Sequence, residues 1–214
     1  MPPTPPAPFP RRWDPLLRLI HWGIAAGVVA NGVLNKPGAS WHVWIGWGLM
    51  ALLALRLLWG LIGPREARFS AFPPRPLAAL SHLQRLGAAL AGRGTVQEHP
   101  SHNPAGAMMA YALWALLAVV SLTGLVMTGG ASPVRLAEER AAVAAGDWSA
   151  LVHEGEDDDH DGEGETGELA EEVHEVAANL MLILAVLHLA GVLAESFALK
   201  RNLVRAMTLG GRRP

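Results

Sequence analysis

Four histidines lie in or at the edge of strongly apolar segments, where an imidazole ring needs a specific partner. They are His21, His42, His174 and His188. His174 and His188 belong to one segment and are fourteen residues apart, which on a helix is a rise of ~21 Å. Fourteen steps of ~100° also place both side chains on nearly the same face of that helix. Rings spaced in this way could act as metal ligands or as proton carriers.

The elements that carry these histidines are four apolar runs in a chain of 214 residues that is 51% hydrophobic. A run of ~20 residues crosses a ~30 Å hydrocarbon core as a helix. The runs lack the polar face, recurring every three or four residues, that a soluble bundle requires. The sequence predicts an all-α integral membrane protein, a four-helix bundle that forms one membrane domain over residues 1–214. Its spans are predicted at about 16–34, 43–62, 107–128 and 175–194.

The distribution of Lys and Arg predicts the orientation of the four spans. Thirteen of the seventeen basic residues lie in the two termini, at the start of the first span, and in the connection between spans two and three. Lys36, Arg135 and Arg140 lie on the opposite side, and Arg56 lies in the second span. The positive-inside rule makes the basic side cytoplasmic, so both termini are expected there.

The connections differ strongly in composition. Residues 1–12 are rich in proline and are expected to be flexible. Between spans two and three, leucines at helical spacing predict an amphipathic helix, either on the inner membrane surface or packed against the bundle; they are Leu77, Leu80, Leu83, Leu86 and Leu90. Residues 129–172 form the predicted periplasmic loop, whose stretch 154–172 holds eleven carboxylates and no Lys or Arg. Such a block is either solvated or a docking surface.

The predicted topology sorts the four histidines into two levels. His42 and His174 share the periplasmic level, and His21 and His188 share the cytoplasmic level. Haem iron accepts an axial nitrogen from each side, and facing helices can supply opposed imidazoles. The chain has no cysteine, which excludes covalent attachment through Cys-x-x-Cys-His and thiolate-ligated iron–sulfur clusters. Two non-covalent haems b, each held by two histidines, are therefore predicted.

Two other roles for the histidines are weaker. Zinc prefers four ligands at one centre, which the ~21 Å separation forbids. Proton relays usually recruit carboxylates, and the interiors of the predicted spans contain none. Near the proposed ligands, Gly46 could let a flat macrocycle approach its helix. Arg18 and Arg56 could pair with haem propionates, although positive-inside anchoring explains them equally well.

The chain resembles the bacterial cytochrome b-561 family, which includes the b-type cytochrome subunits of nickel–iron hydrogenases. The resemblance covers nearly the whole chain. It rests on WDPLLRLIHW, WHVWIGWGLMALLALRLLWG, HNPAG, VHEVAANLMLILAVLHLAGV and NLVRAM. The resemblance implies two haems b ligated by His21 with His188 and by His42 with His174. His99 and His102 precede a helix start near Pro104 and are not expected to be ligands.

The resemblance also implies a function in the bacterial inner membrane. Family members exchange electrons between quinone and a partner, often a periplasmic c-type cytochrome or another redox subunit. One alternative is a superoxide oxidase that passes electrons to ubiquinone, although the acidic outer face would repel superoxide. Another is a membrane anchor subunit of a hydrogenase or dehydrogenase. A homodimer or a larger complex is compatible with each, and nothing suggests binding to nucleic acid.

Overall fold

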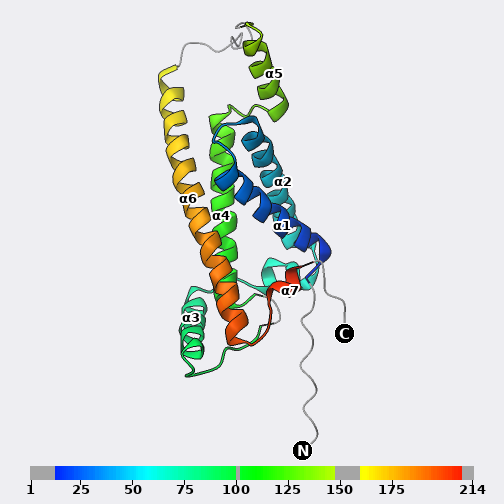
Figure 1. Cartoon of the computed structure of the whole chain (residues 1–214), viewed down its shortest axis with the longest axis vertical. Coiled ribbons are helices and arrows are strands. Elements are labelled where there is room, and N and C mark those ends of the chain that lie inside the picture. The colour runs from blue at the N-terminus through cyan, green and yellow to red at the C-terminus, as the bar shows by residue number, and fades with distance from the viewer. Residues whose placement is uncertain (1–12, 100–101, 148–159, 209–214) are drawn as a thin grey trace, which may run out of the picture. The chain divides into compact units, whose positions relative to one another are not determined.

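The structure is a computed structural model that describes residues 13–99, 102–147 and 160–208. Within these ranges the regular elements are helices, and there is no strand. Residues 1–12, which were predicted to be flexible, lie outside the described ranges. The α-helices, labelled in Figure 1, are α1 (Pro15–Val29), α2 (Ser40–Ile62), α3 (Pro76–Leu90), α4 (Pro104–Met127), α5 (Pro133–Ala144), α6 (His160–Ala198) and α7 (Val204–Met207).

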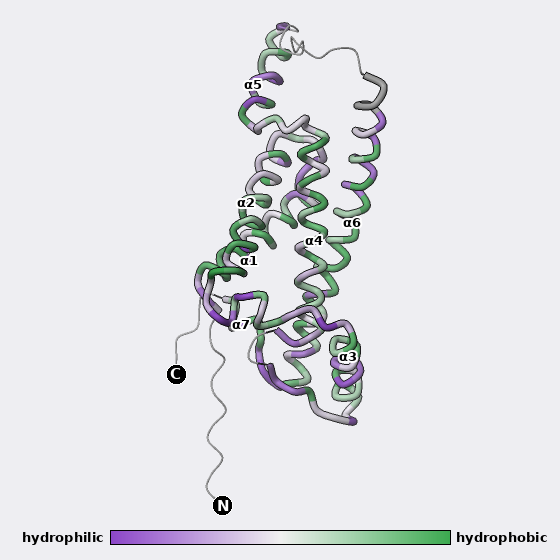
Figure 2. Tube along the Cα trace, turned by 180° about the vertical axis from the view of Figure 1, so that it is seen from behind, coloured by the Kyte–Doolittle hydropathy of each residue, from purple (hydrophilic) through white to green (hydrophobic). Residues whose placement is uncertain are grey.

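Four helical segments of the described residues are long and apolar enough to cross a membrane: Pro15–Leu34, Ser40–Ile62, Pro104–Met127 and Glu165–Ala198. The first combines α1 with a π-helical turn, Ala30–Leu34. Figure 2 shows hydrophobic residues concentrated along α1, α2, α4 and the second half of α6. The predicted all-α fold with four spans is confirmed.

The starts of α1 and α4 follow from local side-chain chemistry. Asp14 precedes Pro15, and its Oδ1 accepts a hydrogen bond from the backbone N–H of Leu17 at 3.0 Å. Asn103 precedes Pro104 in the same way, and its Oδ1 accepts from the N–H of Gly106 at 2.7 Å. In both cases the side chain satisfies an N–H that the first helical turn leaves unpaired, and proline fits the first position.

The chain forms two compact units. Unit 1 comprises Met1–Trp22, Arg56–Tyr111 and Val186–Pro214, and unit 2 comprises Gly23–Leu55 and Ala112–Ala185.

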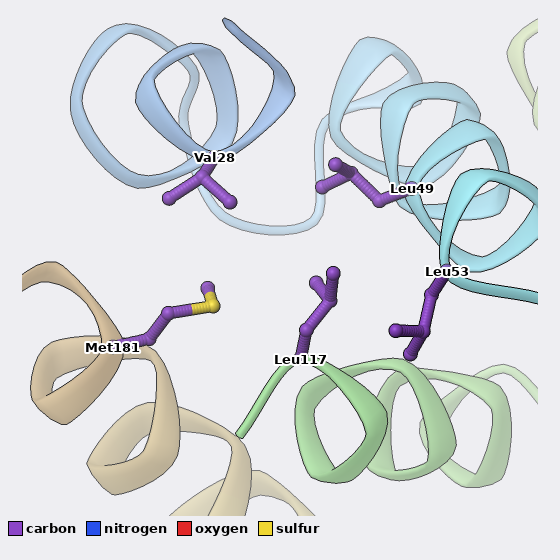
Figure 3. Packing of buried hydrophobic residues seen from close by; sticks show 5 residues of the cluster. All are labelled: Val28, Leu49, Leu53, Leu117 and Met181. Carbon is purple, nitrogen blue, oxygen red and sulfur yellow. The ribbon is translucent and has the colours of Figure 1, made fainter. Parts of the chain in front are cut away.

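The core of unit 2 is made of apolar side chains from α1, α2, α4 and α6. In Figure 3 these side chains point toward one another; they are Val28, Leu49, Leu53, Leu117 and Met181. Gly27 permits the close approach of α2, because a Cβ there would lie 2.7 Å from Cδ2 of Leu49. Close packing of this kind fixes the rotation of each helix about its axis. It thereby fixes the direction in which the histidines of unit 2 point.

The predicted periplasmic loop contains more helix than expected. Helix α5 lies within it, and α6 begins at His160, fifteen residues before the predicted start of the fourth span. Arg140 of α5 donates to Ser40 Oγ at 2.9 Å and to the carbonyl of Gly38 at 2.8 Å. The acidic residues 154–159 lie outside the described ranges.

The amphipathic helix between spans two and three is present as α3. Its buried side chains are Ala79, His82 and Leu86, whereas Leu77, Leu80, Leu83 and Leu90 are exposed. One of the five predicted leucines therefore packs against the protein and the others do not. One face of α3 is packed against the protein, and its position on the inner membrane surface stays a prediction.

Candidate functional site

The four span histidines form two pairs. In unit 1 the ring centroids of His21, on α1, and His188, on α6, are 6.3 Å apart. In unit 2 the centroids of His42, on α2, and His174, on α6, are 6.1 Å apart. These are the two pairings that the sequence predicted. In each pair the rings come from different helices, so the pairing depends on helix packing.

The ring separations fit one metal ion between two imidazoles. With a metal–nitrogen bond of about 2.0 Å and a nitrogen about 1.2 Å from its ring centroid, opposed imidazoles have centroids about 6.4 Å apart. The observed 6.3 Å and 6.1 Å are close to that value. A direct stack or hydrogen bond between two rings would bring them closer. The donor set therefore suits the iron of a haem, which needs two axial nitrogens.

Helix α4 supports His174 through Thr123. The Thr123 hydroxyl lies 2.9 Å from Nδ1 of His174 and 2.8 Å from the carbonyl of Val119. A hydroxyl has one proton, and a carbonyl can only accept it, so Thr123 donates to Val119 and accepts from Nδ1–H of His174. With its proton on Nδ1, the ring keeps the Nε2 lone pair for a ligand bond. Gly124 provides the space, because a Cβ there would lie 3.4 Å from Cε1 of His174.

His42 is held through its backbone. Its carbonyl accepts a hydrogen bond from Asn31 Nδ2 at 2.9 Å, which ties the end of the first span to the start of α2. Nδ1 of His42 is buried and has no hydrogen-bond partner among the described residues. A Cβ added at Gly46, one turn along α2, would meet no atom within 4 Å. The open side of Gly46 is compatible with a macrocycle at this position.

The surroundings of His21 join α1 to the end of the described chain. Trp22 donates from Nε1 to the carbonyl of Met207 at 2.8 Å. Arg18 donates from its guanidinium to the carbonyl of Thr208 at 3.1 Å, and its buried Nε has no partner among the described residues. Arg18 is thus one turn from His21, and its Nε–H is available as a hydrogen-bond donor. The predicted contact with a haem propionate needs such a donor and stays a prediction.

Arg56 is more deeply buried than the sequence suggested, with a relative exposure of 3%. Its guanidinium donates to the carbonyl of Ala67 at 3.3 Å. It also lies 5.4 Å and 5.9 Å from the ring centroids of Phe69 and Phe72, within cation–π range. These contacts give Arg56 a packing role in unit 1, and the propionate role remains a prediction.

His102 packs between aromatic rings. Its centroid lies 4.4 Å from that of Phe72 and 4.9 Å from that of Trp13. Burial, followed by the charge of Arg56 and the nearby imidazoles of His188 and His21, lowers the pKa of His102 to about 4. His102 is therefore neutral near pH 7. That His102 is not a haem ligand stays a prediction.

A conventional metal centre is not formed by the described residues, among which no group of three or more His, Cys, Asp or Glu could hold an ion. Zinc sites use three or four protein ligands. Two opposed imidazoles instead suit an iron whose other ligands come from a porphyrin.

The sequence missed two features of the site. One is Thr123, which looks like an ordinary span residue; a hydroxyl at the depth of a predicted ligand was the available signal. The other is Glu195, which was placed just beyond the fourth span. Helix α6 continues to Ala198, and Glu195 is buried within it at 8% exposure.

Comparison with known families decides the class of protein. The model of the family described as prokaryotic cytochrome b561 matches residues 12–210. The chain belongs to the prokaryotic cytochrome b561 family. Searches of curated proteins and of solved structures return no match. Membership, with four candidate spans, makes this chain a multi-pass bacterial membrane protein that transfers electrons across the membrane by b-type haem.

Proposed function

We propose that this cytochrome b561 holds two haems b, one between His21 and His188 and the other between His42 and His174. The observation that supports this is the pair of ring separations, 6.3 Å and 6.1 Å, each suited to one iron between two imidazoles. When bound, each haem supplies one-electron redox chemistry. The four imidazoles would hold the two haems, Thr123 would keep the proton of His174 on Nδ1, and Arg18 would offer its Nε–H as a hydrogen-bond donor.

The protein passes electrons between the quinone pool and a periplasmic redox protein, in the inner membrane with both termini cytoplasmic. The orientation follows from the basic residues in the termini and in the connection between α2 and α4. It places His42 and His174 on the periplasmic side. The direction of electron flow follows the potentials of the two partners.

The periplasmic partner is a redox protein with a basic docking face, and a c-type cytochrome fits best. Eleven carboxylates lie between residues 154 and 172. In the described part of this stretch, Glu165, Glu168, Glu171 and Glu172 are exposed on the first turns of α6. Complementary charge of this kind raises association rates by about 10 to 10³ at low salt. The same charge disfavours the superoxide oxidase alternative, because superoxide is an anion.

A haem assay tests the proposed cofactors. Purified protein should give two haems b per chain in a pyridine haemochrome assay, both low-spin in the oxidised state. One haem per chain would contradict the proposal, as would two haems that both survive replacement of His174 and His188 by alanine.

Stopped-flow electron transfer to a basic cytochrome c, measured over a salt series, tests the partner. Changing Glu165, Glu168, Glu171 and Glu172 to Gln should lower the rate and flatten its salt dependence, because steering acts mainly on association. Glu66→Gln with Glu98→Gln is the control, since both are predicted to be cytoplasmic. Equal rates in the two variants would refute steering. Faster superoxide consumption after neutralisation would favour the superoxide alternative.

A further inference from the structure

A buried acid and a buried imidazole face each other in unit 1, apart from both histidine pairs. Glu195 of α6 is 8% exposed and His82 of α3 is 2% exposed. Nε2 of His82 lies 3.7 Å from Oε1 of Glu195. This distance is too long for a hydrogen bond, but it is short enough that protonation of one side chain changes the proton affinity of the other. Nε2 has no hydrogen-bond partner among the described residues. Ionisable groups are rarely buried in this way without a function.

Asn103 orients the carboxyl group of Glu195. Its Oδ1 accepts from the backbone N–H of Gly106 at 2.7 Å, at the start of α4. That bond fixes the orientation of the amide, and Nδ2 donates to Oε2 of Glu195. One carboxyl oxygen is therefore held by a neutral donor, and the other faces His82. The carboxyl group can be protonated without breaking the bond to Asn103.

His99 lies beside the pair, on a more exposed part of unit 1. The ring centroids of His82 and His99 are 5.6 Å apart, and His99 is half-buried. Nδ1 of His99 is buried without a hydrogen-bond partner among the described residues. Next to it, the exposed Glu98 accepts a hydrogen bond from Arg201. The imidazole of His99 thus lies between exposed charged groups and the buried pair.

Burial and nearby basic groups oppose the protonation of His82. Burial, followed by the nearby His99 and Arg85, lowers the pKa of His82. In the described part of unit 1, further groups beside the residues of this cluster are Glu98, which pairs with Arg201 and precedes His99, and the neutral His102, which precedes Asn103. Among the described residues, no Lys or Arg forms an ion pair with Glu195, and the nearest basic group is the imidazole of His82. A proton is therefore the available charge compensation for the carboxylate.

Glu195 is placed to respond to the histidine pair of the same unit. It follows His188 by seven residues on α6, which is two turns and about 10.5 Å along the helix axis. Seven steps of ~100° bring both side chains to nearly the same face. A change of charge at the iron held by His188 would therefore be felt at the pair.

We propose that His82 and Glu195 form a proton-uptake site that gains one proton from the cytoplasmic side when the haem held by His21 and His188 is reduced. The inference rests on the proposed function. One electron reduces the iron from ferric to ferrous, and one proton enters through His99, so the local charge is unchanged. The electron comes from quinol or from the periplasmic redox protein, and reoxidation releases the proton.

The expected coupling is large enough to measure. Two unit charges about 10 Å apart, at an effective dielectric constant of about 20, change the proton affinity by on the order of tenfold. Linkage requires the same factor in the affinity for the electron. A tenfold change corresponds to about 59 mV in a one-electron midpoint potential. Proton binding raises that potential, so it should fall as pH rises.

Redox titration of the full protein over a pH series tests the proposal. The spectral component lost in His21→Ala identifies the relevant haem. In the unaltered protein its midpoint potential should fall with rising pH, and Glu195→Gln should flatten this dependence. Reduced-minus-oxidised infrared spectra should contain a carboxyl C=O band that Glu195→Gln removes. Glu66→Gln is the control and should keep both signals, because Glu66 is a carboxylate of the same unit in the turn Arg65–Ala67, outside the cluster of His82, His99 and Glu195.

His82→Gln provides a second variant, because it retains an N–H donor near Glu195 but cannot ionise. It should also flatten the pH dependence. If the pair merely tied α3 to α6, both variants would lower thermal stability and leave the pH dependence unchanged. If Glu195→Gln and His82→Gln both kept two haems and an unchanged pH dependence of the midpoint potential, the proposed proton coupling would be wrong and the proposed function would stand. Absence of the His21–His188 haem from the unaltered protein would instead refute the proposed function.

Discussion

Thr123→Val should weaken the binding of the haem held by His42 and His174. Valine has nearly the shape of threonine but cannot accept the hydrogen bond that joins Oγ1 to Nδ1 of His174 over 2.9 Å. The N–H of the half-buried ligand ring would then lose the hydroxyl acceptor of Thr123. The ring would lose the contact that keeps its proton on Nδ1 and its Nε2 free for iron.

The size of the effect follows from two independent estimates. An unsatisfied buried donor costs about 1–3 kcal/mol, which is about 5- to 150-fold in an equilibrium constant. Loss of the hydrogen-bond partner of a metal-ligating histidine typically costs about 10- to 100-fold in affinity. Both ranges centre on a few tens, so the dissociation constant of this haem should rise by about 30-fold.

Haem titration of the apoprotein, followed by optical difference spectra and by electron paramagnetic resonance of the ferric state, measures this effect. Thr123→Ser keeps the hydroxyl and should bind haem nearly normally. Thr128→Val is a matched control, because the Thr128 hydroxyl also donates to carbonyls of α4, those of Gly124 and Leu125, each at 3.1 Å, and forms no hydrogen bond to a histidine among the described residues. If Thr123→Val and Thr128→Val had the same affinity and spectra, Thr123 would not set the tautomer of His174.

Three further outcomes are expected. His174→Ala should remove one haem or make it high-spin while His21→Ala affects the other, and damage to the same spectral component by both would refute the pairing. The double variant His99→Ala, His102→Ala should retain both haems; loss of either would contradict the four-ligand assignment. The pKa of His102 is about 4, below the unperturbed value of about 6.5, so the unfolded chain binds its proton more readily. Thermal stability should therefore decline as pH falls from about 6.5 to 4, by at most about 3.4 kcal/mol from this group, and His102→Gln should reduce the decline.

The spans and the histidine pairs were predictable because both depend on strong local constraints. A membrane span must be about twenty apolar residues long, and a histidine inside it is rare enough to be conspicuous. Helical periodicity then relates His174 to His188 without any knowledge of packing. The start of α4 could also be predicted from neighbouring residues, since Pro104 follows Asn103, whose side chain caps the helix.

The contacts that support the histidines were not predictable, because they join residues far apart in the sequence. Thr123 and His174 meet only when α4 and α6 pack with a particular rotation. The face that α3 buries was ambiguous for a related reason. Leucines alone suggested one apolar face, but His82 occupies the buried face beside Leu86, because Glu195 of another helix is there to meet it.

Glu195 shows how the end of a predicted span can hide a functional residue. The predicted fourth span stopped at residue 194, because the apolar run ends there, and the absence of carboxylates in the spans argued against proton transfer. The helix itself ends at Ala198, since helix propensity and hydrogen bonding do not stop where hydropathy falls. The last turns of a span are where an ionisable side chain can be reached by water and still be buried by neighbouring elements, here by α3 and the start of α4. A carboxylate within one turn of a predicted span end should therefore be considered with the residues inside the span, and in this protein that places a proton site two turns from a proposed haem ligand.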